Sequence, residues 1–199
     1  WNLHEPESGV YDFETHDLAL FLELAHEYGL YVYLRPGPYF TNEWNGGGLP
    51  SWLNPLGTKE NTDEDGLVNF RTQDPDYLYY VERYFNKLNE VVRPYLITQG
   101  GPIILYSVEN EYDYFDLYFH KEQQEWIKDG FFERNIFSRL DVTAYFEGLR
   151  DIVENDGIDV PIATCPGTAQ VVSTGNVECI IPMPNIYKPD QAEKRAYDT

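Results

Sequence analysis

Apolar residues along the chain alternate between a helical spacing and a strand-like spacing. A helix is predicted over residues 12–30, and Gly29 is suited to end it. Its apolar positions follow the i, i+3, i+4, i+7 pattern and are Leu18, Phe21, Leu22 and Ala25. The run 31–34 that follows is continuously apolar and stops at Pro36 and Gly37, which predicts a short strand buried on both faces.

The same alternation continues toward the end of the chain. Helical spacing over residues 77–91 precedes an apolar run at 103–108, and helical spacing over 142–153 precedes runs at 160–164 and 177–182. Helices that alternate with short, continuously apolar strands predict an α/β fold with a parallel sheet. The spacing alone fits both a closed barrel and an open, doubly wound layer.

The positions of polar residues favour the barrel. They cluster directly after predicted strands, at 2–5, 39–44 and 109–112, where barrel enzymes build their active sites. No Gly-x-Gly-x-x-Gly or phosphate-binding loop follows a predicted strand. A complete (β/α)8 TIM barrel needs about 250 residues, whereas this chain has 199 and begins with Trp1. We therefore expect one incomplete barrel domain.

Charge and composition restrict the partners. The chain has 14 basic and 34 acidic residues, and its formal net charge of −20 repels nucleic acids and anionic membrane surfaces. No apolar run approaches the roughly 20 residues that span a bilayer. The 17 Tyr, 11 Phe and 4 Trp suit a core and also suit stacking against sugar rings. A neutral small-molecule or oligosaccharide partner is favoured over nucleic acid or membrane.

Cysteine and histidine give no sign of a metal or cofactor site. Cys165 and Cys179 are too few for a disulfide scaffold or a self-contained zinc site, and whether they pair is left open. The four histidines share no metal-ligand spacing. We expect no metal and no cofactor.

Two carboxylates stand where a predicted buried strand gives way to a loop, Glu109 and Glu111 on either side of Asn110. Burial near a second acid favours the protonated carboxyl, which a proton donor to a glycosidic oxygen requires. Strict strand alternation would place both Glu side chains on one face, so spacing does not tell which one is the acid. The alternative is that both are ordinary acids on the rim of a loop.

Five motifs follow one another within the first 112 residues. They are Trp1-Asn2-Leu3-His4-Glu5-Pro6, Leu34-Arg35-Pro36-Gly37-Pro38-Tyr39, Gly47-Gly48-Leu49-Pro50-x-Trp52-Leu53, Gly101-Pro102-Ile103-Ile104 and Glu109-Asn110-Glu111-Tyr112. In this order they resemble the glycoside hydrolases of family 35, which are mostly retaining exo-β-galactosidases on a (β/α)8 barrel. Residues 113–199 resemble the family only in their helix and strand rhythm.

The resemblance implies a site that hydrolyses terminal β-linked galactose. It assigns Glu111 as the catalytic acid and base, Asn110 as a ligand of the sugar 2-hydroxyl, and Glu109 as a supporting residue. Glu43 matches the family carboxylate that holds galactose hydroxyls, and a fixed carboxylate that accepts two hydroxyl protons suits that task. Tyr39 is expected to line the same pocket.

Two positions depart from the family pattern and leave the sugar and its linkage open. Asn42 stands where the family commonly has Ala, and Asp113 where it commonly has Gly. Asn42 adds hydrogen-bonding capacity beside the sugar, so it is counted among the substrate-binding residues. A related exo-glycosidase for another terminal sugar and a non-catalytic carbohydrate-binding homologue are the alternatives.

Four further residues lie near the expected site. Trp44 and Trp52, on the glycine-rich stretch, either wall the carbon face of the sugar or anchor the loop, and both interpretations stay open. Arg35 and Glu5 are expected to orient the acids rather than touch the substrate.

The retaining mechanism also needs a nucleophilic carboxylate about 5 to 5.5 Å from the acid, which the family supplies from its seventh barrel strand. If Trp1 ends the second strand, the apolar runs that begin at residues 31, 103, 160 and 177 are strands three to six. Residues 1–199 are then a single catalytic-barrel fragment of roughly strands two to six, which lacks the first and last strands and an identifiable nucleophile. The resemblance also implies an extracellular or secretory/lysosomal location.

Overall fold

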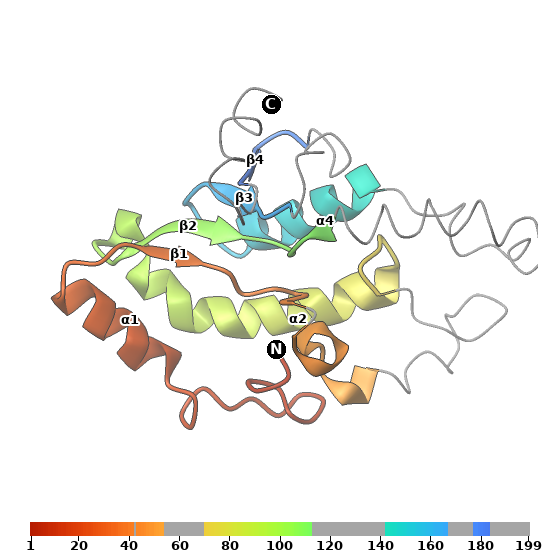
Figure 1. Ribbon diagram of the computed structural model, residues 1–199, viewed down its shortest axis with the longest axis horizontal. Helices are drawn as coiled ribbons and strands as arrows, with labels where there is room; N and C mark the ends of the chain where they lie inside the picture. The colour runs from red at the N-terminus through yellow and green to blue at the C-terminus, as the bar shows by residue number, and fades with distance from the viewer. Residues whose placement is uncertain (42, 54–69, 113–141, 167–176, 184–199) are drawn as a thin grey trace, which may run out of the picture.

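Four short strands form one parallel sheet, as the apolar runs predict (Figure 1). They are β1 (Val32–Leu34), β2 (Ile103–Ser107), β3 (Ile162–Thr164) and β4 (Ile180–Pro182). The computed structural model describes residues 1–41, 43–53, 70–112, 142–166 and 177–183. Val32 of β1 lies opposite Ile103 of β2, and Ile162 of β3 lies opposite Ile180 of β4. The order of the strands in the sheet follows their order in the chain.

Three α-helices occur in the described part of the chain. They are α1 (Leu18–Glu27), α2 (Pro75–Val92) and α4 (Val142–Asn155), and the short 3-10 helices include η1 (Asn45–Gly48), η3 (Arg93–Tyr95) and η4 (Ile97–Gln99). Helix α2 contacts both α1 and α4, and Figure 1 shows α1 and α2 along the same side of β1 and β2. The predicted α/β architecture, with helices between parallel strands, is confirmed. None of these helices is both long and apolar enough to cross a bilayer.

Helix α1 begins later than the predicted residue 12 because the preceding residues form a turn. The Asp12 carboxylate accepts hydrogen bonds from the backbone N–H groups of Glu14 and Thr15, at 3.1 and 2.8 Å. Asp17 then caps the helix by accepting from the backbone N–H of Leu20 at 2.9 Å. Side-chain caps therefore set this boundary, and apolar spacing does not report them.

Helix α2 supplies the centre of the core. Asp74 caps it by accepting from the backbone N–H groups of Asp76 and Tyr77, at 2.9 and 3.4 Å, and Pro75 occupies its first turn. The buried face of the helix consists of Tyr77, Val81, Tyr84, Phe85, Leu88, Asn89 and Val92. This face repeats every three or four residues, so one side of α2 is buried along its whole length.

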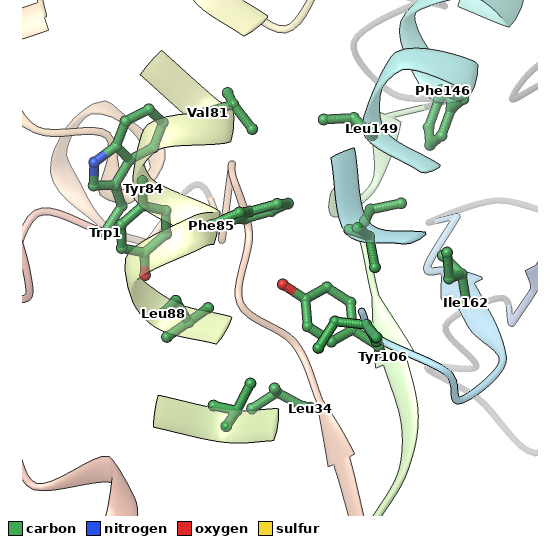
Figure 2. Packing of buried hydrophobic residues seen from close by; sticks show 14 of the residues in the cluster. Trp1, Leu34, Val81, Tyr84, Phe85, Leu88, Tyr106, Phe146, Leu149 and Ile162 are labelled. Atoms are coloured by element: carbon green, nitrogen blue, oxygen red, sulfur yellow. The ribbon is translucent and has the colours of Figure 1, made fainter. Parts of the chain in front are cut away.

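The core fills the space between α2 and the sheet, as Figure 2 shows. Phe85 meets Tyr106 of β2 edge-on, with ring centroids 6.1 Å apart. Trp1 stacks on Tyr84 with its centroid 4.9 Å away and an interplanar angle of 7°. Stacked and edge-on aromatic pairs are favourable geometries. The first residue of the chain is thereby bound to the middle of α2.

Candidate active site

A cavity of about 660 Å³ is lined by residues that follow β1 and β2. Four predicted site residues line it: Tyr39, Glu43, Asn110 and Glu111. Asn42, the fifth, lies outside the described residues, and so does Asp113. The cavity therefore lies where polar residues cluster after the predicted strands.

The chain leaves extended geometry directly after β2. Both Glu109 and Glu111 adopt left-handed backbone angles, with φ of 64° and 48°. Strand alternation therefore does not apply to this segment, and it gives no information on where the two side chains lie. Both residues line the cavity, but Glu109 is 2% exposed whereas Glu111 is half-buried. The two carboxylates, equivalent by spacing, have different surroundings.

Backbone hydrogen bonds fix this segment between the neighbouring strands. The N–H of Glu109 donates to the carbonyl of Gly37, after β1, at 2.9 Å. The N–H of Glu111 donates to the carbonyl of Cys165, after β3, at 2.7 Å. The segment thus continues the parallel ladder on both sides even though its own backbone is no longer extended.

Glu109 is held inside the protein by two residues that the sequence analysis did not identify. Arg71 donates through Nη2 to Oε2 of Glu109 at 2.7 Å, and its Nε lies 3.1 and 3.3 Å from the two carboxylate oxygens. The hydroxyl of Tyr145, on α4, donates to Oε1 at 2.7 Å. Both oxygens of Glu109 are therefore occupied by protein donors.

Arg71, Glu109 and Tyr145 form a cluster in which neighbouring groups affect the pKa values of Arg71 and Tyr145. Burial lowers the pKa of Arg71, but the Glu109 carboxylate beside it raises that pKa, and the net result lies above the ordinary value. Burial, followed by the charge of Glu109, raises the pKa of Tyr145 well above its ordinary range. At neutral pH Arg71 stays charged and Tyr145 stays protonated, so both remain donors to Glu109.

Arg71 and Tyr145 were missed because they are distant from Glu109 in the sequence. Arg71 precedes Glu109 by 38 residues, and Tyr145 follows it by 36. The one available signal was chemical: a carboxylate predicted to be buried needs a positive partner. That signal does not say which of the 14 basic residues is the partner.

Tyr39 and Glu43, the two cavity-lining residues after β1, are held differently. The ring of Tyr39 lies on the Arg71 guanidinium, whose Cζ is 3.7 Å from the ring centroid. Burial raises the pKa of Tyr39, although the charge of Arg71 partly opposes this effect. Glu43 is exposed at the rim and accepts a hydrogen bond from the hydroxyl of Thr41. Tyr39 is therefore part of the buried cluster, whereas Glu43 faces solvent.

Arg35 and Glu5, which are expected to orient the acids, contact other groups in the structure. Arg35 donates through Nη2 to Oδ1 of Asn110, so it orients an amide rather than a carboxylate. Glu5 is fully buried, accepts from Nε1 of Trp1 at 2.7 Å and pairs with Arg83. Glu5 therefore holds Trp1, which lines the cavity.

The two tryptophans of the glycine-rich stretch have separate surroundings. Trp44 lines the cavity and is 46% exposed, so its ring is available to a ligand. Trp52 donates through Nε1 to the carbonyl of Glu5 at 2.9 Å and meets the ring of Trp1 edge-on, with centroids 6.3 Å apart. The loop-anchoring interpretation therefore fits Trp52, and the wall interpretation fits Trp44.

The cavity offers carboxylate, amide and phenol groups. Among the described residues, no three His, Cys, Asp or Glu side chains are grouped so that they could hold a metal ion. His4 is engaged by the carbonyl of Asp12, 2.9 Å from Nδ1, and stacks on Phe13. Cys165 is buried, Cys179 is exposed, and no disulfide joins them.

Comparisons with known proteins agree with these features. The sequence profile of "Glycosyl hydrolases family 35" matches residues 1–158. "Beta-galactosidase" of Pongo abelii and of Homo sapiens are each 48% identical to this chain over 113 residues, which are 56% of the chain and 15% of each relative. "Beta-galactosidase 14" of Arabidopsis thaliana is 44% identical over 131 residues, which are 64% of the chain and 14% of the relative. The chain thus spans a small part of the length of these curated relatives, and by its family match it belongs to the glycosyl hydrolases of family 35.

Proposed function

We propose that this chain forms part of a retaining exo-β-galactosidase in which Glu111 is the catalytic acid and base. The choice of Glu111 rests on one contrast. Glu109 and Glu111 both line the cavity, but Glu109 is only 2% exposed, with Arg71 and Tyr145 donating to its carboxylate, whereas Glu111 is half-buried and so more accessible to a substrate. The relatives from Pongo abelii, Homo sapiens and Arabidopsis thaliana carry the name β-galactosidase, which supports galactose as the sugar.

The reaction proceeds by double displacement. In the first step, the carboxyl of Glu111 gives its proton to the glycosidic oxygen while a second Glu attacks the anomeric carbon, and the leaving alcohol departs. In the second step, the Glu111 carboxylate takes a proton from water, and the water oxygen displaces the second Glu from the same carbon. That second Glu is not identified in residues 1–199.

The substrate-binding residues are Tyr39, Asn42, Glu43 and Asn110. Since Arg35 occupies Oδ1 of Asn110, the amide nitrogen of Asn110 is the group that donates to the sugar 2-hydroxyl. The Glu43 carboxylate accepts protons from two further hydroxyls. Trp44, at the rim of the cavity, covers the carbon face of the ring.

We also propose that β1 to β4 are strands three to six of a (β/α)8 barrel, so that residues 1–199 belong to one catalytic domain. Right-handed crossovers between parallel strands in chain order put the connecting helices on one face of the sheet. The position of α2 between α1 and α4 supports this arrangement, because a doubly wound sheet reverses its strand order at a switch point. The extracellular or secretory/lysosomal location stays a prediction.

The test replaces Glu111 in the natural protein. We expect Glu111→Ala to lower kcat/KM on phenyl β-galactoside by about 10² to 10⁴-fold, since this is the usual contribution of a positioned acid. On 2,4-dinitrophenyl β-galactoside, whose leaving group departs without a proton, sodium azide should restore turnover and yield β-galactosyl azide, because azide attacks the anomeric carbon of the covalent intermediate without needing a base. The matched control is Glu154→Gln on the exposed face of α4, which should keep normal activity.

Three other outcomes would each reject part of this proposal. Near-normal turnover in Glu111→Ala would reject the role of Glu111. Faster cleavage of another sugar in a panel of aryl β-glycosides would replace galactose by that sugar. Galactose binding without cleavage of any glycoside in the panel would identify a non-catalytic carbohydrate-binding homologue.

A further inference from the structure

Arg71 contacts several parts of the candidate active site from inside the protein. Besides its ion pair with Glu109, its Nη2 donates to the backbone carbonyl of Asn110 at 2.8 Å. Its guanidinium also supports the ring of Tyr39. The hydroxyl of Tyr112 donates to the carbonyl of Arg71 itself at 2.8 Å. One side chain, only 7% exposed, therefore joins a carboxylate, a backbone carbonyl and an aromatic ring.

The same cluster contains most of the unusual backbone in the described residues. Arg71, Glu109 and Glu111 are three of the four non-glycine residues with positive φ there, at 61°, 64° and 48°. Such angles are unfavourable for residues with a Cβ and persist only where surrounding contacts enforce them. The contacts of Arg71 with the Glu109 side chain and the Asn110 carbonyl are placed to do this. The direction of the Glu111 side chain therefore depends on Arg71.

The chemistry of the cluster requires a guanidinium. Arg71 binds Glu109 through Nε and Nη2 and reaches Asn110 through Nη2, which needs donors spread over a planar fork. A lysine ammonium would supply the charge but not this spread. Removal of the charge would leave Glu109 buried without its cation, so the segment would shift or admit water.

We propose that Arg71 is a positioning residue, which holds Glu109 and the Asn110 carbonyl so that the Glu111 carboxyl faces the glycosidic oxygen. Arg71 is not among the residues that line the cavity. It acts on the reaction through the segment that carries Glu111. This inference rests on the proposed function.

A misplaced acid and an unstable protein have different kinetic signatures. A 2,4-dinitrophenolate departs without a proton, so kcat/KM on its β-galactoside reports the active fraction and the attack at the anomeric carbon. Phenolate needs a proton to leave, so phenyl β-galactoside also reports the position of Glu111. The ratio of the two values isolates proton donation, because a loss of folded protein lowers both equally.

The test measures this ratio in variants of the natural protein. We expect Arg71→Met to lower kcat/KM on phenyl β-galactoside by about 100-fold relative to kcat/KM on 2,4-dinitrophenyl β-galactoside, which is the usual effect of misplacing a catalytic group by about 1 Å. Arg71→Lys should give an intermediate shift. Tyr145→Phe should give a smaller shift in the same direction, because it removes one donor from the Glu109 carboxylate. Tyr106→Phe is the matched control and should keep the wild-type ratio, since it removes an equally buried hydroxyl that donates to Asn89, at 3.0 Å.

The following outcomes would overturn the inference. If Arg71→Met and Tyr145→Phe lose both activities equally, or if Tyr106→Phe shifts the ratio as much as they do, the cluster has only a structural role. If Arg71→Met does not fold, a wild-type ratio in Tyr145→Phe overturns the inference by itself. A wild-type protein that cleaves neither glycoside overturns the proposed function and the role of Arg71 with it.

Discussion

At the scale of single residues, Gly47 leaves the space that the ring of Tyr39 occupies. A Cβ on Gly47 would lie 1.8 Å from Cε2 of Tyr39, and the φ of Gly47 is 68°. We expect Gly47→Ala to lower the free energy of unfolding by more than the roughly 1 to 2 kcal/mol that a left-handed angle costs a residue with a Cβ. The ring of Tyr39, a proposed substrate-binding residue, must then move away from Arg71. Binding of the galactose-like inhibitor 1-deoxygalactonojirimycin should therefore also weaken. Urea denaturation and titration calorimetry measure the two effects.

Gly46→Ala is the matched control for this substitution. Gly46 has a φ of 61°, but a Cβ there would meet nothing within 4 Å. It should therefore lose only the backbone contribution and bind the inhibitor normally, and equal losses in both variants would contradict a steric role for Gly47. The glycine run was visible in the sequence. The difference between its members was not, because it depends on the ring that lies beside one of them.

The two glutamates after β2 show the same limit at the residue scale. Their motif identified both positions, but the difference between them comes from donors more than 30 residues away in each direction. Glu109 is engaged by Arg71 and Tyr145, and no local pattern contains those contacts. The family resemblance assigns the catalytic role to Glu111, and that role stays a prediction.

At the scale of elements, the N-terminal cap of α2 connects the helix to the segment that carries Arg71. Asp74 accepts from two helix N–H groups, and its own N–H donates to the hydroxyl of Thr72 at 3.1 Å. We expect Asp74→Ala to lower the free energy of unfolding by about 1 kcal/mol, because the first turn loses its acceptor. Asp74→Asn keeps an acceptor oxygen and should lose less. Urea denaturation of both variants checks this, and equal losses would assign the effect to charge instead of capping.

The elements themselves were predictable because their signals are local. Apolar spacing identified α1, α2, α4 and all four strands, since each pattern lies within about 20 residues. Their ends were less accurate. The turn around Asp12 moved the start of α1, and the positive φ of Glu109 ends extended geometry directly after the apolar run, so that strand alternation does not continue to Glu111.

At the scale of the whole molecule, burial is distributed unevenly among the helices. Helix α2 buries seven side chains, whereas α4 buries four and α1 buries two. Helix α2 also lies between the other two. This ranking of the helices by burial was not predictable from the sequence, since all three helices show an apolar face. It follows from the packing of α2, which contacts α1 and α4 and meets β2 through Phe85 and Tyr106.

We therefore expect the amide hydrogens of α2 to exchange most slowly among the three helices, because its opening requires the largest loss of buried apolar contact. Phe85→Ala should raise exchange in α2 and in β2 together, since Phe85 is fully buried against Tyr106 and such truncations cost about 3 to 5 kcal/mol. Tyr79→Ala, on the exposed face of the same helix, should leave that exchange nearly unchanged. Hydrogen exchange followed by mass spectrometry measures all three proteins. Slower exchange in α1 or α4 than in α2 would show that the stability of the molecule is not centred on this helix.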